Sequence, residues 1–94
     1  MISLRGKSLA AVSKDIAEGY VIVNPLFLKP LDAETLKGLY QQIIKIQVEI
    51  RSEKFPFKDI ASIRYRNIRL QRLHTALMII KTFAKERGLK QLFL

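Results

Sequence analysis

The residues of this chain with the clearest chemical potential are basic, and they lie in one stretch of sequence. There is no acidic side chain between residues 60 and 85. The notable side chains of this stretch, with Lys58 just before it, are Arg64, Tyr65, Arg66, Arg69 and Arg72. The planar guanidinium group of arginine pairs with phosphate or carboxylate, and a tyrosine ring can stack on a nucleic-acid base. We therefore expect a partner-binding surface, named here the basic patch, that consists of Lys58, Arg64, Tyr65, Arg69 and Arg72.

Several interpretations of the basic patch stay open from the sequence. A phosphate-bearing partner such as nucleic acid is favoured slightly over an acidic protein or an oligomer contact, and solvated charge is the third interpretation. A fourth is internal, because Glu49 and Glu53 would face the start of the basic stretch in an antiparallel pair of helices. Two carboxylates cannot neutralise all of these cations, so several arginines should remain available to a partner.

The other side chains argue against catalysis and metal binding. There is no cysteine, and the one histidine, His74, has no neighbouring carboxylate in the sequence, so we expect it on the surface. Glu49 and Glu53 could share a helix face, but no second acidic pair accompanies them. A glycine-rich phosphate loop and a nucleophile motif are both missing. We expect a protein that is not an enzyme and that has no catalytic residue, cofactor or metal.

Length and charge place the chain in a broad class. Its 94 residues suffice for one domain, 1–94, at the small end of what can bury a core without disulfides or metals. The formal net charge is +9, and most of it comes from residues 57–94, which contain nine basic and two acidic side chains. The longest apolar runs are about five residues, far below the roughly 18 to 20 that cross a bilayer. We expect a cytoplasmic protein without a transmembrane segment.

Two long helices should position the basic stretch. Apolar side chains recur at spacings of four and three between residues 58 and 87, which predicts a helix, and they are Ile63, Leu70, Leu73, Leu77, Ile80 and Ala84. Asp59 is placed to cap its start and Gly88 to end it. Between residues 33 and 53 the same repeat follows the cap residue Asp32 and consists of Leu36, Leu39, Ile43, Ile46 and Ile50.

The rest of the chain should close one end of this helical hairpin. Ser8 can cap a short helix over residues 8–18 that ends at Gly19. Residues 20–31 combine β-branched residues with prolines, which predicts an extended arm. A connection as short as residues 54–58 joins antiparallel helices.

The short connection also predicts how the two helices are aligned. If Glu53 lies opposite about Lys58, the last turns of the long helix extend beyond the start of the first helix. These turns are apolar on more than one face. Ile79 and Phe83 should therefore be covered by the arm, or by a second protomer in a homo-oligomer.

These patterns predict an all-α protein built on a long antiparallel helical hairpin of coiled-coil type. For its function we expect a non-enzymatic binding module that presents the basic patch to an acidic partner, with nucleic acid marginally preferred. The alternative is a protein-interaction or assembly protein whose hairpin oligomerises or packs on the helices of a partner.

Overall fold

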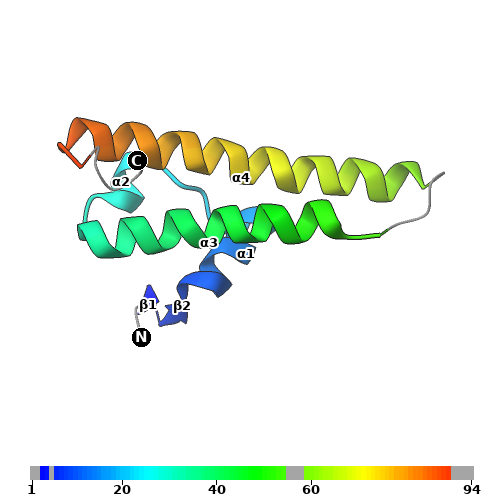
Figure 1. Ribbon diagram of the computed structural model, residues 1–94, viewed down its shortest axis with the longest axis horizontal. Helices are drawn as coiled ribbons and strands as arrows, with labels where there is room; N and C mark the ends of the chain where they lie inside the picture. The colour runs from blue at the N-terminus through cyan, green and yellow to red at the C-terminus, as the bar shows by residue number, and fades with distance from the viewer. Residues whose placement is uncertain (1–2, 5, 55–58, 90–94) are drawn as a thin grey trace.

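The computed structural model describes residues 3–4, 6–54 and 59–89, and this part of the chain is mainly helical (Figure 1). Its elements are, in order, β1 (Ser3–Leu4), β2 (Lys7–Ser8), α1 (Leu9–Glu18), α2 (Pro25–Leu28), α3 (Ala33–Ser52) and α4 (Ile60–Glu86). α3 and α4 lie side by side and antiparallel along the molecule, and α1 packs against both. The two strands pair as a small antiparallel hairpin that the sequence did not indicate. The predicted all-α class and the helical hairpin are confirmed.

Side-chain caps begin the helices at the predicted residues. The backbone N–H of Thr35 donates to Asp32 Oδ1 at 2.7 Å, and that of Ser62 donates to Asp59 Oδ1 at 3.0 Å. Ser8 accepts in the same way at the start of α1. Each cap satisfies an amide that has no partner within its own helix, and typically contributes about 1 kcal/mol.

A left-handed glycine ends α4, as the sequence predicts. Gly88 has a φ of 76°, a value that favours glycine because it has no Cβ. The N–H of Leu89 donates to the carbonyl of Ala84 at 2.7 Å, and the N–H of Gly88 donates to Lys85 at 3.1 Å. These two bonds satisfy carbonyls at the helix end. Leu89 packs against the core, so the end of α4 is also fixed by an apolar contact.

The core lies where the apolar stripes of α3 and α4 meet α1. All the predicted stripe residues of α3 are buried, namely Leu36, Leu39, Ile43, Ile46 and Ile50. In α4 burial is confined to the second half, at Leu73, Ala76, Ile80 and Ala84. α1 adds Val12, Ile16 and Ala17 to the same cluster. Removing this apolar surface from water supplies the main driving force for the fold.

The alignment of α3 with α4 differs from the expected one. Glu53 pairs with Arg69 rather than with a residue near 58, and Arg87 reaches the carbonyl of Leu31. The first turns of α4, not its last turns, therefore continue beyond the end of α3 (Figure 1). This alignment brings the α3 stripe alongside the second half of α4, which contains the buried residues of that helix, and apolar burial favours it. Ile60 in the projecting turns is 64% exposed.

The predicted arm packs on α4, but it is not extended throughout. Asn24 caps a single helical turn, α2, by accepting from the N–H of Phe27 at 2.8 Å. The arm buries Val23, Leu28 and Leu31 in the core, and α2 packs against α4. Ile79 and Phe83 are half-buried and pack against this cluster. Both side chains therefore lie beside residues of the chain's own arm.

The described core predicts that truncation to alanine has very different effects on stability at two positions of α4. Leu73 is fully buried, so Leu73→Ala should lower the free energy of unfolding by about 2 to 5 kcal/mol. Met78 is 52% exposed, so Met78→Ala should change it by less than about 0.5 kcal/mol. Urea unfolding followed by circular dichroism measures both variants, and similar losses in the two would contradict the described packing.

Candidate functional site

Two members of the basic patch are engaged in contacts that hold the helices together. Arg69 donates to both carboxylate oxygens of Glu53, at 3.2 and 3.0 Å, and its guanidinium carbon lies 4.4 Å from the centre of the Tyr65 ring. The Tyr65 hydroxyl donates to the carboxylate of Glu18 on α1. This cluster joins α1, the end of α3 and α4, and the Arg69 side chain is only 14% exposed.

The ionisation of this cluster follows from its hydrogen bonds. The two bonds from Arg69 lower the pKa of Glu53, because they stabilise its charged form. The bond to Glu18 raises the pKa of Tyr65, because the donating hydroxyl must keep its proton. The pKa of Arg69 is raised in turn by Glu53. The carboxylate and the guanidinium therefore neutralise each other, as the internal interpretation of the patch requires, although the pair forms at Arg69.

Arg72, a third member of the patch, holds the end of α1. Its Nη1 donates to the carbonyl of Ala17 at 3.0 Å. Gly19 ends α1 with a φ of 83°, and a Cβ at this position would lie 3.0 Å from the guanidinium carbon of Arg72. The arginine therefore lies against a backbone surface that a side chain would block. A cation is also favourable at the negative end of a helix dipole.

The remaining basic residues of the stretch have different surroundings. Arg64 is exposed on the projecting turns of α4, and Arg66 is half-buried and makes contacts within the chain. Lys58 lies outside the described residues. The structure thus brings Tyr65, Arg69 and Arg72 together on the side of α4 that faces α1, and leaves Arg64 on another side.

The acidic side chains are largely used inside the chain. Of the eight acids, five accept hydrogen bonds from other groups of the protein, and they are Asp15, Glu18, Asp32, Glu53 and Asp59. Nine exposed basic side chains make no hydrogen bond or ion pair with other described residues, and they are Lys14, Lys29, Lys37, Lys45, Arg51, Lys54, Arg64, Lys81 and Lys85. These nine cations therefore remain available to a partner at the described surface.

Several of these cations share a side of the α3/α4 pair that sequence reasoning missed. α1 meets α3 at Gly38 and α4 at Arg72. We name the opposite side of these two helices the open face, and its residues follow from a rotation of about 100° per residue along each helix. They are Lys37, Tyr40, Ile44, Val48, Arg51, His74, Met78, Lys81 and Lys85. Within these two described helices, no acid falls on that side. Recognising it requires knowing where α1 docks.

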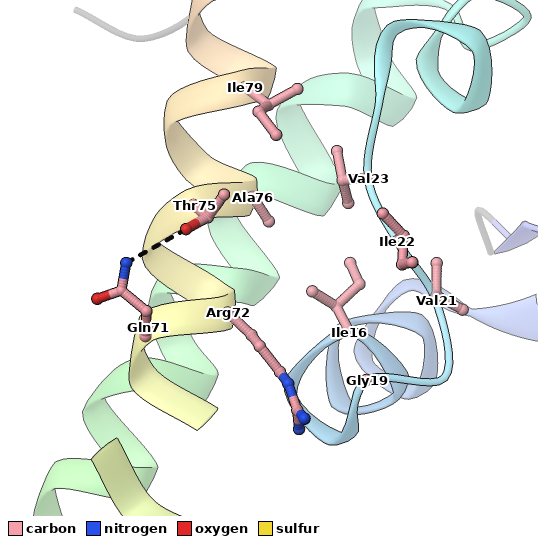
Figure 2. Close-up of a pocket in the computed structure, with 10 residues that line it drawn as sticks. All are labelled: Ile16, Gly19, Val21, Ile22, Val23, Gln71, Arg72, Thr75, Ala76 and Ile79. Carbon is pink, nitrogen blue, oxygen red and sulfur yellow. Dashed lines mark hydrogen bonds between the residues drawn. The ribbon is translucent and has the colours of Figure 1, made fainter. Parts of the chain in front are cut away.

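A cavity of 390 Å³ lies beside Arg72, between the end of α1, the arm and α4 (Figure 2). Ile16 of α1, Val23 of the arm and Ile79 of α4 line it, with Ala76 at its wall. Gln71 and Thr75 supply its polar edge. We name it the arm cavity. Of the two residues predicted to contact the arm or an oligomer, Ile79 lines this cavity, and Phe83 lines a neighbouring hollow with Leu26.

The described residues contain no group of three histidine, cysteine or acidic residues placed to hold a metal ion. His74 is exposed, as expected. None of the described helices combines the length and the apolar character needed to cross a membrane.

Comparisons with protein-family models, with curated proteins and with solved structures find no match to this chain. The arguments about its function therefore rest on the geometry and charges described above.

The Glu53–Arg69 pair predicts a loss of stability in acid. The pKa of Glu53 is lowered from its ordinary value of 4.5, so the stabilisation is present above that pH and disappears as the pH falls through the lowered pKa. Glu53 is partly exposed, so Glu53→Gln should cost no more than about 1 kcal/mol near pH 7, and less near pH 3. Urea unfolding at the two pH values measures this difference. Glu49→Gln is the control, and an equal effect there would contradict the assignment.

Because Arg72 packs on Gly19, we expect substitution of Gly19 to reduce stability more than substitution of Gly88. Gly19→Ala and Gly88→Ala both place a Cβ on a left-handed residue, which costs about 1 to 2 kcal/mol. At Gly88 the added atom meets nothing within 4 Å, whereas at Gly19 it meets Arg72. Thermal unfolding should therefore show a larger loss for Gly19→Ala. Equal losses would contradict a rigid contact between Arg72 and this backbone.

Proposed function

We propose that this protein is a non-enzymatic binding module whose open face binds nucleic acid. The observation that supports this most directly is the imbalance of charge on that face. Lys37, Arg51, Lys81 and Lys85 project from it, whereas the acids of the described chain are mostly engaged elsewhere. A polyanion that approaches this side meets cations without competing carboxylates, and releases its condensed counterions on binding.

The arrangement of the open face suits an extended polyanion better than a small anion. Lys37 and Arg51 stand 14 positions apart on α3, which corresponds to about 21 Å along the helix axis. That span covers several phosphates of a strand. Between them lie the half-buried ring of Tyr40 and the exposed side chains of Ile44 and Val48, which offer apolar contact to bases and sugars.

A second candidate partner is an acidic helical protein, as in the assembly alternative. Ile44, Val48 and Met78 on the open face are 40%, 55% and 52% exposed. Apolar residues grouped on one side of paired helices are typical of surfaces that pack against another helix. Nucleic acid remains the first proposal because cations outnumber acids along the whole length of this face. A protein partner would show a weaker dependence of affinity on salt.

Salt-dependent binding tests the proposal. Fluorescence anisotropy with labelled single- and double-stranded oligonucleotides of about 20 nucleotides should give an affinity that falls linearly with salt on logarithmic axes. The variant Arg51→Ala/Lys81→Ala/Lys85→Ala should weaken binding and reduce the slope by roughly 0.7 to 0.9 for each phosphate contact removed.

A matched control removes the same charge from other places. Lys14→Ala/Lys29→Ala/Lys45→Ala changes three exposed lysines that lie off the open face. This variant should keep most of the affinity. Equal weakening by the two triple variants would indicate a general charge effect, and affinity that does not change with salt would contradict nucleic-acid binding.

A further inference from the structure

The arm cavity has the features of a site for a small amphiphile. Its volume of 390 Å³ falls within the range of about 300 to 1,000 Å³ that is usual for small-molecule sites. Its walls come from three separate parts of the chain, and Figure 2 shows Ile16, Val23 and Ile79 around one space. Ile22 at its edge is 76% exposed.

The charge at this cavity has one sign. Arg72 is the one ionisable side chain among its lining residues, and Figure 2 shows the guanidinium reaching from α4 toward Gly19. The guanidinium is held by the carbonyl of Ala17, which fixes its position without neutralising it. Arg69, one turn earlier, differs because a carboxylate neutralises it. Arginine has further N–H donors, so Arg72 can hold the carbonyl and bind an anion together.

We propose that the arm cavity binds a monocarboxylate with an alkyl chain, of the kind represented by a medium-chain fatty acid. The carboxylate pairs with Arg72 at the α1 end, and Gln71 and Thr75 form the polar edge of the cavity along α4. The alkyl chain lies among Ile16, Val23 and Ile79 and covers Ile22. Charge complementarity selects the headgroup, because no acid lines the cavity, and the apolar walls select the tail.

This site is separate from the one proposed for nucleic acid. The open face lies on the side of α3 and α4 turned away from α1, whereas the arm cavity is bounded by α1 itself. No residue of the open face lines the cavity. The two proposals can therefore fail independently, and each has its own variants.

The test compares acids with alcohols on the unmodified chain. Isothermal titration with octanoate, decanoate and decanol, below the concentrations at which they form micelles, gives the affinities. Decanoate should bind about tenfold or more tightly than decanol, because an anion can accept charge-assisted hydrogen bonds from the guanidinium. Each added methylene should tighten binding by up to about fourfold. Decanol that binds as tightly as decanoate would overturn the proposal.

Two variants locate the headgroup. Arg72→Ala should remove the preference for decanoate over decanol. Arg87→Ala should keep it, and this is a close control, because Arg87 also donates to a backbone carbonyl at 3.0 Å but lines the neighbouring hollow. A preference that survives Arg72→Ala, or disappears with Arg87→Ala, would contradict the assignment.

Amide chemical shifts locate the ligand without any substitution in the site. Decanoate should shift the backbone resonances of Gly19, Val23, Thr75 and Ile79 more than those of α3. The open-face triple variant should bind decanoate as the unmodified chain does. Shifts centred on another surface would overturn the proposed site, even if decanoate binds.

Discussion

The polar docking of α1 on α4 determines which surfaces the molecule can offer to a partner. Tyr65 and Arg69 join α1, α3 and α4 through Glu18 and Glu53, and Arg72 donates to the carbonyl of Ala17 near the end of α1. Each of these contacts is modest by itself, because the groups are partly exposed. Their importance is geometric, since they lie at the rim of a buried contact and orient α1 across the pair of long helices. The arm and its cavity follow from that orientation.

This docking also distributes the charge. The carboxylates of Glu18 and Glu53 lie on the α1 side, where they engage Tyr65 and Arg69. Three of the other six acids, Asp15, Asp32 and Asp59, pair locally or cap helix starts. The chain has a net charge of +9, and many of its cations lie away from these carboxylates. Within the described helices, the open face has no acid. The placement of the acids away from the open face thus leaves one side of the molecule basic, and nucleic-acid binding is proposed on this ground.

The sequence predicted the features that depend on near neighbours. Caps at Asp32 and Asp59, and the left-handed Gly88, are set by residues within a turn of each other, so their patterns were sufficient. The partners of Arg69 and Arg72 were not predictable in the same way, because they lie 16 and 55 positions away. These partners depend on the alignment of α4 along α3. Apolar burial favours one alignment, and the length of the connection does not determine it. The open face and the arm cavity were missed for this reason.

Arg69 and Arg72 show why residue type and spacing do not suffice to define a binding surface. They lie three positions apart on one helix, and the sequence assigns both to the basic patch. The end of α3 brings a carboxylate to Arg69, which cancels its charge, whereas the end of α1 brings a carbonyl to Arg72. A carbonyl is a dipole, so it orients the guanidinium and leaves the full charge in place. Arg72 therefore keeps its positive charge beside the apolar walls of the arm cavity, where an anion with an alkyl chain can meet both.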